Sequence, residues 1–106
     1  MSINPLYVTV EEDGHVVAEA SVRIHAQDRS VQADLHLEAG HLPVGIRTRL
    51  VDAVLDRTAA APGTRLDVTL PAGDGEILDR LRERCDALQT RPAGASCLAT
   101  GSVASA

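Results

Sequence analysis

The sequence predicts a single α/β (α+β) domain built on one mixed sheet, with the element order β-β-β-α-β-α-β. In the first third of the chain apolar and polar residues alternate, which is typical of strands. In two later stretches apolar residues recur every three or four positions, which is typical of helices, and a short extended segment follows each stretch. At 106 residues, 44% of them hydrophobic, the chain is too short for two cores. We therefore expect one domain over residues 1–106, ordered from about residue 5 to about residue 103.

The first third of the chain has the alternation expected of strands with one buried face. Apolar residues alternate over 6–10 and again over 16–24, and the acidic turn at 11–14 joins the two strands as a hairpin. A polar connection at 26–30 leads to a third alternating strand at 31–38. These elements predict a three-stranded antiparallel meander.

A first helix is predicted from Val44, where the apolar residues change to helical spacing. Pro43 suits the first turn of this helix, and residues 61–63 end it before a strand at 64–70. The connection between the third and fourth strands therefore passes through a helix, which predicts that these two strands are parallel. The apolar face of this helix consists of Ile46, Leu50, Val51, Val54 and Leu55.

A second helix is predicted after residues 71–74, with Asp74 as its N-cap. Its polar face alternates arginines with acids, which is typical of a solvated surface rather than an anion site. Residues 90–94 are predicted to form a turn, and 95–103 a closing strand. The apolar stripe of this helix consists of Ile77, Leu78, Leu81, Cys85 and Leu88. The arginines of its polar face are Arg80, Arg82 and Arg84.

The charge of the chain argues against polyanionic partners. The formal net charge is −5 and the pI about 5.2, so nucleic acid or an anionic membrane surface would meet repulsion. No apolar run approaches the roughly 18 residues that a membrane-spanning helix needs. All ten basic residues are arginine, within a composition typical of a GC-rich bacterial genome. We expect no nucleic-acid or membrane partner.

Cysteine and histidine usage suggests neither disulfides nor metal. The two cysteines, Cys85 and Cys97, occur in a chain whose start lacks the runs of a secretory signal, which favours reduced thiols in a cytoplasmic protein. The four histidines lack the spacing of a zinc site, so we expect no metal. Ser96 and Cys97 lack the sequence frame of a catalytic nucleophile.

Two segments carry a resemblance to a known family. Residues 33–38, ADLHLE, and 41–51, HLPVGIRTRLV, form a strand, a loop and a helix, and 67–71 with 77–85 form a further strand and helix. In these segments and in element order, the chain resembles the GNAT (GCN5-related N-acetyltransferase) superfamily over residues 5–103. The resemblance implies a GNAT core that lacks the N-terminal strand and two helices of the family, and it implies acetyl-CoA as the cofactor.

In that family the N-terminus of a helix holds the pyrophosphate of coenzyme A through free backbone N–H groups and the positive helix dipole. The family pattern is Arg or Gln, two residues, Gly, one residue, then Gly or Ala. Residues 42–47 keep the central glycine and place Arg47 last, where it could neutralise a phosphate or fill its space. Residues 35–38 would pair with pantetheine. The resemblance assigns the cofactor to Leu37, Val44, Gly45, Ile46, Arg47 and Arg49.

The resemblance also suggests a general base, because the family commonly uses a carboxylate on the coenzyme-bearing strand. Glu38, or His36 two residues before it, would take this role, and the alternative is that both are ordinary solvent-facing residues. The family's frequent acid, a tyrosine on the last helix, falls at Leu81, and the glycine that usually follows that helix turn is replaced by Cys85. The family elements that build much of the acceptor pocket have no counterpart before Leu6.

Two hypotheses follow for function. The first is an acetyl-CoA-dependent N-acetyltransferase that acts on a small amine. The second, which we favour, is a divergent non-catalytic or weakly active module for acyl-CoA binding or regulation. The missing N-terminal elements would leave a sheet edge and a half-open groove, which a second copy could cover as a homodimer or a small-molecule acceptor could occupy.

Overall fold

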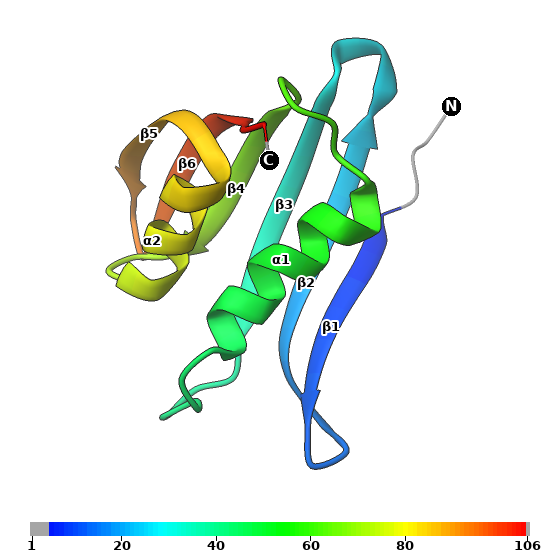
Figure 1. The fold of residues 1–106 in the computed structure, drawn as a ribbon. Coiled ribbons are helices and arrows are strands. Elements are labelled where there is room, and N and C mark those ends of the chain that lie inside the picture. Colours follow the sequence, from blue (N-terminus) through cyan, green and yellow to red (C-terminus); the bar gives the residue numbers. More distant parts are fainter. Residues whose placement is uncertain (1–4, 106) are drawn as a thin grey trace.

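The structure is a computed structural model and describes residues 5–105 (Figure 1). One six-stranded sheet runs through the whole molecule, and a short 3-10 helix at Ala26–Asp28 joins its second and third strands. The other elements are β1 (Leu6–Glu12), β2 (His15–His25), β3 (Ser30–Leu37), α1 (Ile46–Thr58), β4 (Arg65–Pro71), α2 (Gly75–Arg84), β5 (Cys85–Ala93) and β6 (Ser96–Val103).

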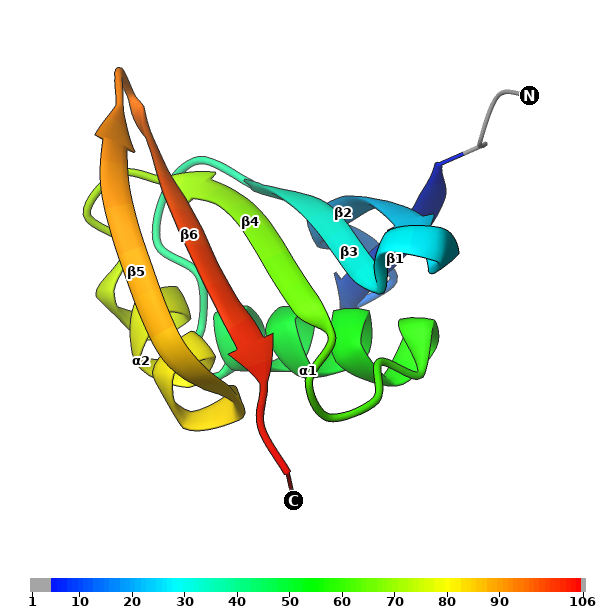
Figure 2. The same cartoon turned by 90° about the horizontal axis from the view of Figure 1, so that it is seen from above.

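The strands lie in the order β1-β2-β3-β4-β6-β5, and every neighbouring pair is antiparallel except β3 and β4. The predicted antiparallel meander and the predicted parallel pair are both confirmed. Figure 2 shows that α1 and α2 cover the same face of the sheet, and within residues 5–105 neither α-helix covers the other face. The molecule therefore has two layers.

The core lies between this covered face and the two helices. Alternate residues of β1 to β4 point toward the helices and are buried, as the apolar alternation predicts. The predicted apolar face of α1 is buried in full, from Ile46 to Leu55. The largest fully buried side chains are Ile46, Leu50, Leu66, Leu70, Ile77, Leu81 and Val22.

The end of α2 differs from the sequence prediction, and so does the number of strands. The helix stops at Arg84, and Cys85 begins β5, so the expected helical stripe through Leu88 and the expected turn at 90–94 are wrong. A β-bulge interrupts the apolar alternation by which this strand could be recognised in the sequence. At the bulge, Ala87 has a φ of 55° and the register with β6 shifts between Asp86 and Gln89. The observed order is β-β-β-α-β-α-β-β.

Gly101 makes this bulge sterically feasible. A Cβ at Gly101 would lie 3.1 Å from the carbonyl oxygen of Asp86 and 3.2 Å from Cβ of Cys85. Only glycine lets β6 approach the bulged segment of β5 this closely without a shift.

The start of α1 also differs from the prediction. Pro43 does not lie in the first turn, because α1 begins at Ile46 and Gly45 is its N-cap. Gly45 has a φ of 96°, a conformation that side chains with a Cβ rarely adopt. Val44 lies in the preceding turn and is 97% exposed, so it is not part of the apolar helix face.

Candidate functional site

The candidate site lies where β3 and β4 stop pairing. Their parallel ladder runs from Ser30 opposite Arg65 to Asp34 opposite Thr69, whereas β3 continues to Leu37 and pairs there only with β2. α1 follows β3 through the loop that ends at Gly45. This is the arrangement that the resemblance implies, with a strand leaving its neighbour and leading into a helix tip.

The backbone of β3 has free polar groups beyond the ladder. The carbonyl of Arg29 accepts a hydrogen bond from the Arg65 N–H toward β4, and the Glu38 N–H donates to Val17 toward β2. Since backbone direction alternates along a strand, Leu35 and Leu37 direct their N–H and C=O groups toward β4. The last bridge of the ladder, Asp34 opposite Thr69, uses the Leu35 N–H, which faces the Thr69 carbonyl. The free groups are therefore the C=O of Leu35, which would meet Pro71 and its missing N–H, and the N–H and C=O of Leu37. These groups are where the resemblance places pantetheine.

The tip of α1 is closed by a side chain from α2. Gly45 has no side chain to cap the helix, and the backbone N–H of Thr48, the third residue of α1, donates to Oε2 of Glu76 at 3.1 Å. The Thr48 hydroxyl donates to the same oxygen at 3.2 Å. The Ile46 N–H donates to the carbonyl of Pro43 at 3.4 Å. Two of the first three amides of the helix are thus already engaged.

Arg47 is held by the same end of α2. Its Nε donates to Oδ2 of Asp74 at 2.6 Å, while Oδ1 of Asp74 accepts from the Ile77 N–H at 3.1 Å and caps α2 as the sequence predicts. The side chains of Arg47 and Asp74 are 24% and 8% exposed. The guanidinium of Arg47, for which the sequence left open neutralising a phosphate or filling its space, is thus already paired with a carboxylate.

These contacts do not fit the diphosphate of a coenzyme. A hollow of about 460 Å³ lies beside the helix tip, lined by Arg47 and residues 71–76, but it carries the carboxylates of Asp74 and Glu76. A diphosphate there would meet two negative charges and an amide that is already bonded. Arg49, a predicted cofactor residue, points to β1 instead, where it lies 3.5 Å from Glu12.

The predicted catalytic residues, Glu38 and His36, are both exposed at the surface. Oε2 of Glu38 lies 2.6 Å from Nε2 of His15, and both side chains are largely exposed. His36 is exposed, and strand alternation places it on the face opposite to the buried Ala33 and Leu35. Leu81, at the position of the family's tyrosine, is 1% exposed in the core. Burial raises the pKa of Cys85, so this thiol stays protonated and is a core residue rather than a nucleophile.

A second set of contacts joins the two helices further along. Arg80 donates to both carboxylate oxygens of Asp52, at 2.8 and 2.9 Å, and Arg84 donates to Oδ1 at 2.7 Å. The prediction of a solvated arginine face is therefore wrong for Arg80 and Arg84. Arg82 does face solvent, where it pairs with Asp79. Sequence reasoning missed Asp52 because nothing in the sequence pairs residues so far apart.

The contacts of Asp52 with Arg80 and Arg84 should make the packing of α1 against α2 sensitive to acid. Partial burial raises the pKa of Asp52, but the hydrogen bonds and charges of Arg80 and Arg84 outweigh it and hold the pKa below 3.8. A carboxyl group with a lowered pKa in the folded state stabilises the fold at pH values above its pKa in the unfolded state. This stabilisation is lost as the pH falls through the pKa of the folded state. We expect the free energy of unfolding to decrease below about pH 4, measured by urea denaturation across pH.

The variant Asp52→Asn should lose about 1–2 kcal/mol at neutral pH and have a shallower decrease in acid. Asp79→Asn is the matched control, because its exposed pair with Arg82 should contribute less than about 0.5 kcal/mol. If the free energy of unfolding depended on pH in the same way for the wild-type chain and Asp52→Asn, protonation of Asp52 would not be the cause of the loss of stability in acid.

Comparison with known proteins shows the fold. No protein-family model matches the sequence, and no curated protein matches it significantly. Among solved structures, a GNAT-family acetyltransferase from Streptococcus pneumoniae superposes with a TM-score of 0.63 at 11% identity, over 98% of this chain and 69% of that one. The ribosomal-protein-S18-alanine N-acetyltransferase from Escherichia coli has a TM-score of 0.66 at 11% identity, over 100% and 74%.

A phosphinothricin acetyltransferase of the GNAT superfamily from Sinorhizobium meliloti, solved in complex with acetyl-CoA, superposes with a TM-score of 0.60 at 15% identity. The match covers 94% of this chain and 62% of that one. Within residues 5–105, no helix has the length and apolar character to cross a membrane. No group of three metal-ligating side chains lies together in that range. The chain has the fold of the GNAT acetyltransferases.

Proposed function

We propose that this chain is a non-catalytic GNAT-fold module, which acts by binding a partner rather than by transferring an acyl group. The observation that carries the proposal is the carboxylate of Glu76 on the Thr48 amide. This carboxylate occupies the helix tip that would have to hold the diphosphate of an acyl-CoA. An internal anion at that position satisfies the helix end without a ligand.

The remaining candidate groups support the same conclusion. Glu38 is paired with His15 at the surface, and the buried Leu81 has no proton to donate. A general base and a general acid must both lie within hydrogen-bond reach of the reacting groups. The cysteines are both unpaired thiols, which supports a reducing compartment, and we propose the cytoplasm as the location.

One observation favours the alternative, an acetyl-CoA-dependent N-acetyltransferase acting on a small amine. Leu35 and Leu37 retain free backbone groups at the opening between β3 and β4, which pantetheine could use. Binding of pantetheine by β3 alone would be weak, because no group of the protein would then bind the phosphates of the cofactor. Under this alternative Glu38 is the base, and Glu38→Gln should reduce turnover by about 10²-fold or more.

Calorimetric titration with acetyl-CoA and a thiol-release assay over a panel of small amines test the proposal. We expect no saturable heat at millimolar acetyl-CoA and no thiol release above the enzyme-free rate, because the helix tip is closed. An active GNAT acetyltransferase run in parallel controls the assay. Turnover that falls in Glu38→Gln would contradict the proposal and establish the alternative.

A further inference from the structure

The two edges of the sheet differ in how they are protected. β5, at one edge, contains Pro92 and the bulge at Ala87, both of which hinder pairing with a further strand. β1, at the other edge, is regular over residues 6–10 and has neither proline nor charge there, and its register shift comes only after Val10. An unprotected edge of this kind can pair with another chain.

The free backbone groups of β1 belong to Tyr7 and Thr9. The Glu38 N–H donates to the carbonyl of Val17, so odd-numbered residues of β2 face β3 and even-numbered residues face β1. Val8 lies opposite Ala20, and the even-numbered residues of β1 therefore face β2. Tyr7 and Thr9 direct their N–H and C=O groups away from the sheet, where no other strand of the described chain lies.

Residues 6–10 can pair with the same residues of a second copy of the chain in an antiparallel arrangement. With Val8 opposite Val8 of a second copy, Leu6 lies opposite Val10, so the apolar stripe of the covered face continues across the junction. Tyr7 lies opposite Thr9, and each such pair exchanges two backbone hydrogen bonds. Tyr7, the one aromatic residue of the chain, is 58% exposed and would gain this cross-strand contact.

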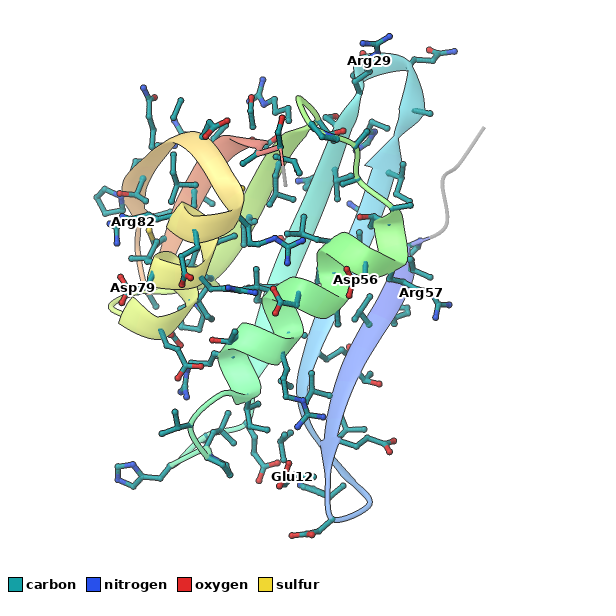
Figure 3. All side chains as sticks on the ribbon, in the orientation of Figure 1. Glu12, Arg29, Asp56, Arg57, Asp79 and Arg82 are labelled. Carbon is teal, nitrogen blue, oxygen red and sulfur yellow. The ribbon has the colours of Figure 1, made fainter. Side chains whose placement is uncertain are left out.

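The charges at the two ends of β1 match this two-fold arrangement. Figure 3 shows Arg57 at the end of α1 that lies over the start of β1, and Glu12 at the far end of the strand. Arg57 is exposed and forms no ion pair with any residue from 5 to 105, and Glu12 reaches only Arg49, at 3.5 Å. An antiparallel copy exchanges the two ends, which brings Glu12 of the second copy toward Arg57.

We propose that the chain forms a symmetric homodimer through antiparallel pairing of its β1 strands, with Val8 at the two-fold axis. The pairing joins two sheets into one and places two Arg57–Glu12 pairs at its ends. A closed two-fold contact uses the edge once per copy, so it stops at the dimer. This surface is independent of the helix tip, and the dimer goes beyond the proposed loss of catalysis.

Sedimentation-velocity centrifugation over a range of chain concentrations tests the dimer. The wild-type chain should sediment as a dimer that dissociates on dilution. Thr9→Pro removes an outward-facing N–H without touching the ladder to β2, and it should give a monomer at concentrations where Thr9→Ala, which keeps that N–H, remains dimeric. A wild-type chain that is monomeric throughout, or a folded Thr9→Pro variant that still dimerises, overturns the proposal.

A charge exchange tests the register and does not depend on proline. Arg57→Glu or Glu12→Arg alone puts like charges together at two symmetric places and should raise the dissociation constant about tenfold. The double variant restores both pairs in reverse and should return the dissociation constant to near the wild-type value. Additive weakening in the double variant would overturn this register, because it would show that the two residues do not meet.

Discussion

Replacing Leu81 with alanine is expected to lower the free energy of unfolding by about 2–5 kcal/mol and the melting temperature by roughly 10 °C or more. Leu81 is 1% exposed and lines the same small apolar cavity in the core as Val51 of α1 and Leu66 of β4. Removing its side chain leaves a cavity that close-packed neighbours cannot fill. Thermal unfolding followed by circular dichroism measures the loss.

Leu78→Ala is the matched control on the same helix. Leu78 is only half-buried at the margin of the core, so the same truncation should cost clearly less. Leu81→Tyr should also destabilise, because a larger ring and a hydroxyl would enter a packed interior. A Leu81→Tyr variant that folded normally and gained acyl-transfer activity would contradict this account, because its hydroxyl would then reach the reacting groups as the family's tyrosine does.

Replacing Glu76 with alanine is expected to open the tip of α1 to anions. The variant frees the Thr48 amide and removes a negative charge beside it, so the affinity for inorganic pyrophosphate should rise by about tenfold or more. The same change removes a cap from α1 and should cost about 1 kcal/mol of stability. Calorimetric titration with pyrophosphate and urea denaturation measure the two effects.

Glu83→Ala is the matched control for charge. Glu83 lies on the exposed face of α2, and among residues 5–105 it pairs only with Arg80, at 3.3 Å, so its removal changes the net charge equally without reaching the helix tip. Pyrophosphate affinity should stay at the wild-type value in this variant. An equal gain in Glu83→Ala and Glu76→Ala would mean that net charge, rather than the contact with Thr48, excludes the anion.

Much of the fold could be predicted because its elements have simple periodicity. The alternation around Val8, Ala20 and Ala33 and the spacing of Leu50 and Val54 identify strands and a helix, and these positions are buried as expected. β5 could not be predicted in this way. Its bulge interrupts the alternation, and its first residue continues the helical spacing of α2.

The candidate site was harder to predict than the fold. Sequence reasoning singled out Gly45 because the family resemblance places its central glycine there, although it began the helix at Val44, two residues before its observed start at Ile46. The partner of the helix tip is not local, since Glu76 lies 28 residues from Thr48. An acidic residue in the first turn of α2 is also expected from the dipole of its own helix, so nothing marked Glu76 as a cap for α1.

The central claim is that Glu76 closes the helix tip against a diphosphate. Amide correlation spectra recorded during titration with pyrophosphate test it most directly, because the Thr48 signal reports on the bonded N–H itself. The account expects the Thr48 signal to stay in place in the wild-type chain and to shift saturably in Glu76→Ala. A saturable Thr48 shift in the wild-type chain would contradict it.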